Sequence, residues 1–155
     1  MLDALWVNDK EYAILKLLGK GKGGYSYLAK RDNEYVVVKQ IHHEPCDYYQ
    51  FGNKIEAEIN DYKRLQCIGI SMPQMLDVDI ANERIVKEYI CGDTVYELIL
   101  KDNLPQDCLC QIKNMCHLLY NAKTNIDYFP TNFILQNGIL YYVDYECNDY
   151  MEEWN

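Results

Sequence analysis

The stretch 12–41, YAILKLLGKGKGGYSYLAKRDNEYVVVKQI, carries the pattern that decides the fold. Three apolar runs at 12–18, 25–30 and 35–41 are rich in strand-forming residues. A glycine cluster and the polar turn at 31–33 separate them. Turns this short join antiparallel neighbours, whereas a parallel crossover needs about a dozen residues or more. We therefore expect an antiparallel meander.

Beyond this stretch the apolar residues are spaced in some segments as in a helix and in others as in a strand. Apolar residues recur at helical spacing over 51–68, and Gly69 stands where a C-terminal cap belongs. The later pattern predicts strands at 74–79 and 83–90, helices at 93–101 and 105–123, and a hairpin of 133–135 with 139–143 around Asn137-Gly138. The inner face of the helix at 105–123 is expected to comprise Leu109, Ile112, Met115 or Cys116, and Leu119.

The order of these elements predicts an α+β chain in two lobes. Residues 1–90 are expected to form a five-stranded antiparallel lobe with one helix. Residues 91–155 are expected to form a shortened, mostly helical lobe that ends in a loop and a hairpin. With 155 residues, of which 49% are hydrophobic, the chain is long enough to bury a core without disulfides.

Charge and cysteine usage narrow the class of protein. The 24 acidic and 15 basic side chains give a net charge of −9, which repels phosphate backbones and anionic lipid. We therefore expect neither a nucleic acid nor a membrane as partner. The seven cysteines form no C-x-x-C pair, and no signal peptide begins the chain, so we expect free thiols in the cytoplasm.

Four of the eight glycines fall within 19–24 and spell G-x-G-x-x-G. Glycines let the backbone approach a ligand closely and point N–H groups at an anion. A dinucleotide-binding fold needs a helix after the last glycine, and a Walker loop needs Gly-Lys-Ser/Thr; the strand-like 25–28 and Gly24-Tyr25-Ser26 fit neither. A hairpin that covers nucleotide phosphates fits this context, and a plain flexible hairpin tip is the alternative.

A lysine and a glutamate are predicted to form an ion pair. Strand alternation places Val37 and Lys39 on one face of the sheet. Glu58 lies inside the apolar stripe of its helix, between Ile55 and Tyr62. A buried carboxylate is costly unless it is paired, and Lys39 is its predicted partner. The alternative is a surface lysine at the end of an edge strand.

Three polar side chains are predicted to meet around the hairpin at 133–143. Singly, Asp127, Asn132 and Asp144 are most often turn formers. Together their spacing matters, because the hairpin folds Asp144 back beside Asn132. Oxygen ligands of this kind hold Mg²⁺, while Asp127 is free to take a proton from a hydroxyl nucleophile.

These motifs, in order from Tyr12 to Glu146, resemble those of the protein-kinase-like superfamily. The resemblance implies a protein-kinase-like fold, ATP and Mg²⁺ as cofactors, and a hinge at 86–90. It implies catalytic roles for Asp127, Lys39 and Glu58, and Mg²⁺ ligation by Asn132 and Asp144. The ATP-binding residues that it implies are Gly19, Lys20, Gly21, Lys22, Gly24, Val37, Lys39, Glu88 and Ile90.

Several positions depart from the family's pattern. Phe129 stands where protein kinases have a lysine, and Asn125-Ile126 stand where they often have His-Arg. Asp144-Tyr145-Glu146 replaces Asp-Phe-Gly and is similar to the aminoglycoside and choline kinase branch. Only 11 residues follow Asp144, so we expect the acceptor-binding helices to be absent. The apolar face thereby left open predicts self-association or a partner chain.

Three functions are compatible with the sequence. The first is an ATP/Mg²⁺-dependent phosphotransferase that acts on a hydroxyl acceptor, either protein Ser/Thr or a small molecule. The second is a pseudokinase, which binds nucleotide and regulates a partner. The third is a structural adaptor without a ligand, which leaves Glu58 on an apolar face unexplained.

Overall fold

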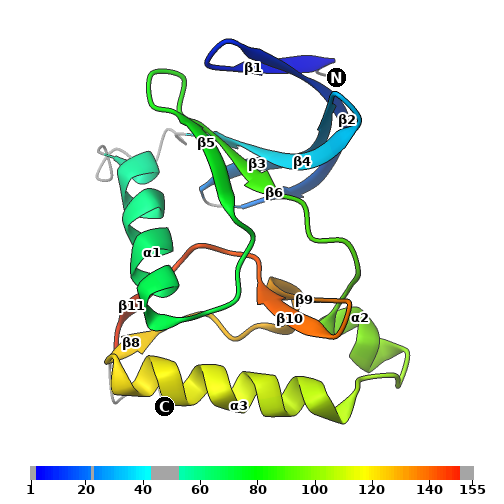
Figure 1. The fold of residues 1–155 in the computed structure, drawn as a ribbon, viewed down its shortest axis with the longest axis vertical. Coiled ribbons are helices and arrows are strands. Elements are labelled where there is room, and N and C mark those ends of the chain that lie inside the picture. The colour runs from blue at the N-terminus through cyan, green and yellow to red at the C-terminus, as the bar shows by residue number, and fades with distance from the viewer. Residues whose placement is uncertain (1–2, 22, 43–52, 151–155) are drawn as a thin grey trace. The chain divides into compact units, whose positions relative to one another are not determined.

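The computed structural model describes residues 3–21, 23–42 and 53–150. The chain divides into two compact units (Figure 1). The first comprises Met1–Ala57 and Gln74–Tyr89, and the second comprises Glu58–Pro73 and Ile90–Asn155. Each unit has its own hydrophobic cluster.

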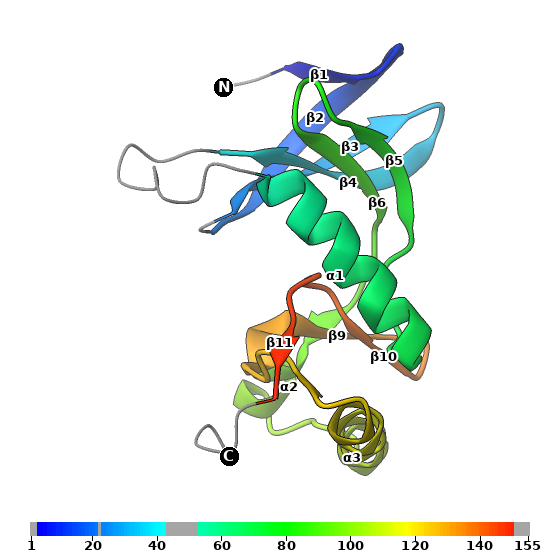
Figure 2. The same cartoon turned by 90° about the vertical axis from the view of Figure 1, so that its left-hand side faces the viewer.

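The first unit is built on a six-stranded antiparallel sheet with the order β1-β2-β3-β4-β6-β5. The strands are β1 (Ala4–Val7), β2 (Lys10–Lys20), β3 (Gly24–Arg31), β4 (Glu34–Ile41), β5 (Met75–Asp79) and β6 (Arg84–Glu88). Figure 2 shows that this sheet curls. The curl brings the β1–β2 turn to β5, where the amide of Asn8 donates a 2.8 Å hydrogen bond to Asp79 Oδ2.

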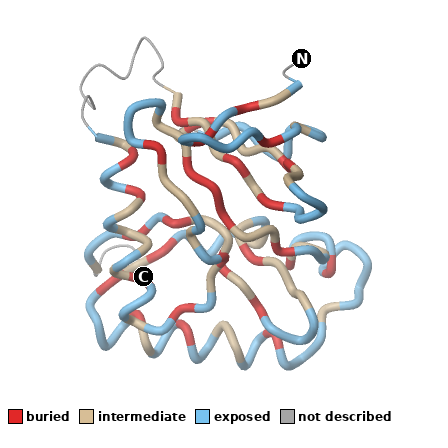
Figure 3. The backbone as a smooth tube through the Cα atoms, turned by 45° about the horizontal axis from the view of Figure 1, so that its top comes forward, coloured by how far each residue is buried: buried red, intermediate tan, exposed pale blue. Residues whose placement is uncertain are grey.

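The predicted meander of β2, β3 and β4 is confirmed. Both pairs are antiparallel, and the turn between β3 and β4 has Asp32 and Asn33 at φ 52° and 69°. Left-handed residues at both central positions match the twist of hairpin strands. One face of the sheet carries a buried cluster. In Figure 3 buried residues are red and alternate with less buried ones along the chain. Its members are Leu5, Val7, Tyr12, Ala29, Val36, Val38 and Val86.

The second unit combines helices with two small sheets, ordered β10-β9-β7 and β11-β8. Its strands are β7 (Asp93–Thr94), β8 (Thr124–Asn125), β9 (Phe133–Gln136), β10 (Ile139–Tyr142) and β11 (Asn148–Asp149). Its helices are α2 (Val95–Leu100), α3 (Gln106–Asn121) and most of α1 (Lys54–Ile68), which starts in the first unit. The predicted hairpin is present as β9 and β10, and Asn137 and Gly138 take φ 51° and 81° in its turn.

Helix limits in this unit follow from local signals. Gly69, at φ 102°, caps α1, and its N–H donates to the carbonyl of Leu65 at 3.1 Å. Phe51 and Gly52, where this helix was predicted to begin, lie outside the described residues. Thr94 and Glu97 form a capping box at the start of α2.

The predicted inner face of α3 is partly wrong. Leu109 is 52% exposed and Cys116 is exposed, whereas Cys108, Met115 and Leu119 are buried. The buried face therefore starts one residue earlier and recurs through positions 108, 112, 115 and 119. Its residues join the cluster formed by β9, β10 and the end of α1, whose largest members are Leu65, Phe133, Leu140 and Tyr142.

The predicted fold class is wrong. The described residues form eleven strands and three helices, so this part of the chain is mostly β. A six-stranded curled sheet replaces the five-stranded lobe, because the four residues of β1 pair with β2, and four residues are too few to show a period in the sequence. The half predicted to be mostly helical contains five short strands.

The helices of the described ranges contain 15, 6 and 16 residues. None of them combines the length and the apolar character that crossing a bilayer requires.

Candidate functional site

The glycine-rich segment forms the turn between β2 and β3. Gly19 and Lys20 lie within β2, where Lys20 pairs with Tyr25 of β3. The N–H of Gly21 donates to the carbonyl of Gly24 at 2.9 Å and closes the turn. Lys22 lies outside the described residues. The strand–turn–strand context that distinguished this motif from a dinucleotide or Walker loop is therefore present.

Lys39 lies against this turn. It stands on β4 opposite Ser26 of β3, and a Cβ added at Gly23 would lie 3.2 Å from Lys39 Nζ. Val37, two residues earlier on β4, faces the same side of the sheet, opposite to the buried cluster. The Lys39 ammonium therefore lies beside a glycine-rich turn. A cation next to closely approachable backbone N–H groups suits an anionic ligand.

The two predicted hinge residues lie on either side of the unit boundary. In the first unit the Glu88 N–H donates to the carbonyl of Gln74 at 2.8 Å, and its carboxylate accepts from the Gln74 N–H at 3.0 Å. Because the Glu88 N–H is already engaged, an adenine that contacts Glu88 would bind the carbonyl oxygen of that residue. Ile90, in the second unit, is 3% exposed.

Glu58 is buried on α1, as the helical period predicts. Its exposed fraction is 8%, whereas Glu56 is exposed. Lys39 and Glu58 belong to different compact units. Their ion pair stays a prediction.

Asp127 and Asn132 bracket one loop of the second unit, and hydrogen bonds hold both ends. Asp127 Oδ1 accepts from the Phe129 N–H at 3.0 Å, and Asn132 Nδ2 donates to the Asp127 carbonyl at 3.1 Å. A short 3-10 turn, η2 (Pro130–Asn132), ends the loop. The amide oxygen Oδ1 of Asn132 is the atom that would ligate a cation, because the amide nitrogen is only a donor.

The β9–β10 hairpin brings Asn132 and Asp144 to the same end of the strand pair. Phe133 pairs with Tyr142, and the N–H of Val143 donates to the Asn132 carbonyl at 2.9 Å. Within residues 3–21, 23–42 and 53–150, no three His, Cys, Asp or Glu side chains form a metal-binding cluster. With only two protein ligands, Mg²⁺ would need water or phosphate oxygens to complete its shell. The Mg²⁺ site stays a prediction.

Tyr142, the last residue of β10, is not among the residues that the sequence motifs predict. Its side chain is fully buried, and its hydroxyl donates to the Glu146 carbonyl at 2.9 Å. Burial, with the Asp144 carboxylate next in importance, raises the pKa of Tyr142 far above its ordinary value. Strand alternation predicts only that such a residue points inward. It does not predict which backbone group its hydroxyl hydrogen-bonds.

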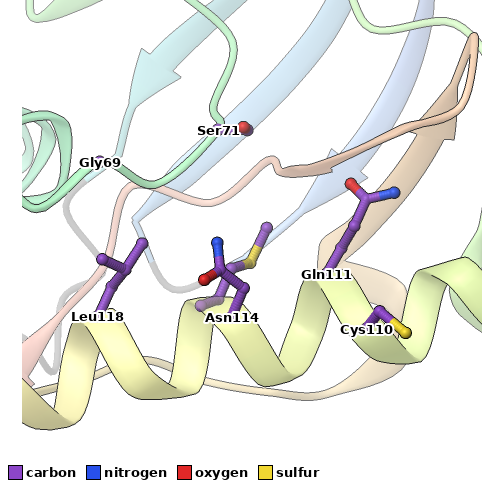
Figure 4. Close-up of a pocket in the computed structure, with 7 residues that line it drawn as sticks. Gly69, Ser71, Cys110, Gln111, Asn114 and Leu118 are labelled. Carbon is purple, nitrogen blue, oxygen red and sulfur yellow. The ribbon is translucent and has the colours of Figure 1, made fainter.

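A pocket of about 200 Å³ lies elsewhere in the second unit, between α3 and the segment after α1. Gln111, Asn114 and Leu118 project from α3 toward that segment (Figure 4). The other lining residues are Gly69, Ser71, Cys110 and Met115. None of the residues predicted to bind ATP or Mg²⁺ lines this pocket.

Comparison with known proteins adds no relative. No protein-family model matches the chain, and no curated protein matches it. The resemblance to the protein-kinase-like superfamily rests on the order of the motifs in the sequence.

Proposed function

We propose that this chain binds ATP with Mg²⁺ and transfers the γ-phosphate to a hydroxyl acceptor. The observation that carries the proposal is the position of the Lys39 ammonium against Gly23, in a turn whose glycines leave room for a ligand. Successive backbone N–H groups and a cation together favour a polyphosphate.

The remaining residues have defined roles in this transfer. The acceptor oxygen forms a bond to the γ-phosphorus, the bond from that phosphorus to the bridging oxygen breaks, and ADP leaves. Asp127 accepts the proton of the hydroxyl, while Asn132 and Asp144 would hold Mg²⁺, which would offset the charge of the phosphates. Positioning and electrostatics supply most of the rate enhancement in such reactions. The proposal requires Lys39 and these three side chains to act on one nucleotide.

A second candidate is a pseudokinase that binds nucleotide and regulates a partner. The observation that favours it is the absence of any Lys or Arg after Lys123. Phe129 stands where protein kinases have a lysine. The loop that would receive the acceptor therefore carries no lysine or arginine side chain.

The acceptor class includes protein Ser/Thr and small-molecule alcohols. We place the protein in the cytoplasm, where ATP and Mg²⁺ are abundant. The free state of Cys67, Cys91, Cys108, Cys110, Cys116 and Cys147 supports a reducing compartment.

Thermal melting with ATP, with and without Mg²⁺, tests the proposal when it is combined with an assay for ADP release. Lys39→Ala is expected to abolish the ATP-induced shift in Tm and to lower turnover by about 100-fold, because it removes the cation at the phosphates. Lys30→Ala is the matched control: Lys30 lies on β3 of the same sheet, with its amine 5.3 Å from the Tyr35 ring. This variant is expected to keep both properties.

The outcomes separate the candidates. Turnover that Asp127→Asn abolishes, with the ATP-induced shift retained, supports the phosphotransferase. A shift in Tm without turnover supports the pseudokinase. No shift with ATP contradicts both.

A further inference from the structure

We infer that Lys87 is a specificity-determining residue of the proposed nucleotide site, and that it makes GTP bind more tightly than ATP. The inference rests on the proposed function and names the base that the same site prefers. The observation behind it is a buried lysine on the face of the first unit's sheet that also carries Lys39.

The strand register places Lys87 on this face. Lys87 of β6 lies directly opposite Val37 of β4, and directly opposed residues of an antiparallel pair point to the same side of a sheet. Val86, the preceding residue of β6, belongs to the buried cluster on the other face. Lys87 is 5% exposed, whereas lysine side chains are rarely this buried. A cation is therefore buried on the face where we propose that the nucleotide binds.

Two rows of side chains cross this face at different distances from the glycine-rich turn. Gly24 pairs with Ile41 at the end of β4, so Ser26 and Lys39, which oppose each other, form the row nearer to the turn. The next row lies about 7 Å farther along the strands. Its members oppose one another across β3, β4, β6 and β5 and are Leu28, Val37, Lys87 and Met75. The first row is thus polar, and the second is apolar except for one ammonium.

This arrangement matches the two ends of a nucleotide. With the phosphates at Lys39 and the glycine-rich turn, the base would extend toward the second row. Leu28 and Val37 would then contact the apolar ring of the base, and Lys87 would meet its polar edge. An ammonium has three N–H donors and no acceptor, so it can hold a protein acceptor and an atom of the base at the same time.

A group that only donates hydrogen bonds distinguishes guanine from adenine. Guanine presents two adjacent acceptors, O6 and N7, to which a lysine ammonium can donate together. Adenine has an amino group at the same position, and its N–H donors would face the N–H donors of Lys87. The 6-carbonyl of guanine therefore suits Lys87 better than the 6-amino group of adenine.

The test measures the Kd of ATP, GTP and ITP for the full chain by calorimetry at a fixed Mg²⁺ concentration. GTP should bind about tenfold more tightly than ATP, as expected for one good contact to a base edge. ITP has the 6-carbonyl but lacks the 2-amino group of GTP, so it should bind like GTP. This comparison needs no variant.

Three variants test whether Lys87 causes the preference. Lys87→Met should weaken GTP binding to about the level of ATP. Lys87→Gln should shift the preference toward ATP, because an amide both donates and accepts and so pairs with adenine N6 and N7. Lys30→Met is the matched control, since Lys30 lies opposite Tyr35 on the same face, one row farther from the turn. It should keep the preference for GTP.

Equal binding of GTP and ATP by the wild type, or tighter binding of ATP, would overturn the inference and leave the proposed function intact. ITP that binds like ATP would overturn it too, because the preference would then come from the 2-amino group. A preference that survives in both Lys87→Met and Lys87→Gln would show that Lys87 does not read the base. If neither ATP nor GTP binds, the proposed function fails together with the inference.

Discussion

Lys39 Nζ lies 3.2 Å from the point where a side chain at Gly23 would place its Cβ. The neighbouring glycine has a different constraint, since a Cβ at Gly24 would lie 2.1 Å from the backbone oxygen of Gln40. One glycine therefore leaves room for a flexible cation and the other for a neighbouring strand. Substitutions at the two positions should have separable effects.

Gly23→Ala is expected to weaken ATP binding several-fold and to leave the Tm without ligand almost unchanged. The added methyl group meets only the end of a lysine side chain, which moves by a few tenths of an ångström away from its place at the turn. Titration of ATP against each variant measures the first effect, and melting without ligand measures the second.

Gly24→Ala provides the contrast, because rigid backbone blocks the new methyl group. It should lower the free energy of unfolding by about 2 kcal/mol or more, as overpacking does. Equal losses of stability in the two variants would contradict the distinction drawn between these glycines.

Sequence patterns predict local features of this protein better than long-range ones. Alternation correctly assigns Val37 and Lys39 to one face of β4, and the Asn-Gly pair correctly predicts the β9–β10 turn. The strand β1 is missed because its four residues show no period. The turn that follows it is held by hydrogen bonds from Asn8 to Asp77 and Asp79, about 70 positions away.

The same limit applies to the candidate site. Motif spacing singled out Asp127, Asn132 and Asp144 and correctly predicts that the hairpin returns the chain to Asn132. It gives no sign of Tyr142, because the hydrogen bond from a buried hydroxyl to the Glu146 carbonyl follows from tertiary packing and not from any period. The fold class failed for a related reason: strands of two residues, such as β8, exist only through their partners.

Asp79→Ala is expected to destabilise the first unit by about 2–3 kcal/mol, because three donors lose a buried acceptor. Asp79 is 4% exposed and accepts from the Asn8 N–H, the Asn82 N–H and Asn82 Nδ2. Asp77→Ala is the control, since Asp77 accepts only an exposed bond from the Asn8 side chain and one from the next amide. Urea unfolding of both variants measures the difference, and similar losses would contradict the assigned role.

The stabilisation by Asp79 should depend on pH. The Asn82 side chain and the Asn8 amide lower the pKa of Asp79 below its ordinary value of 3.8. A carboxylate with a lowered pKa contributes stability above the pKa of the unfolded chain and loses it as the pH falls through the folded value. The gap in unfolding free energy between wild type and Asp79→Ala should therefore be constant near neutral pH and shrink below pH 3.8. A gap that widens in acid would rule this account out.

Gln111→Ala should lower the free energy of unfolding by about 1–2 kcal/mol, because its amide joins α3 to the β9–β10 hairpin. Gln111 Oε1 accepts from the Leu140 N–H at 2.8 Å, and Nε2 donates to the Gly138 carbonyl at 2.9 Å. Lys113→Ala, on the exposed face of the same helix, should have little effect. Chemical denaturation followed by circular dichroism compares the two, and a neutral Gln111→Ala would show that water replaces these bonds.

Asp61→Asn is expected to stabilise the protein at neutral pH. Desolvation by burial raises the pKa of Asp61 above its ordinary value of 3.8, and this effect outweighs the hydrogen bond from Cys147 and the attraction of Arg64. The folded protein thus holds this proton more tightly than the unfolded chain, so the associated stability is present at low pH and lost as the pH rises through the folded pKa. Asparagine keeps the shape and an acceptor oxygen without the charge. The Tm at pH 7 should rise by roughly 2 °C, with no gain below pH 3.8. A lower Tm at pH 7 would mean that attraction to Arg64 exceeds the penalty of burial.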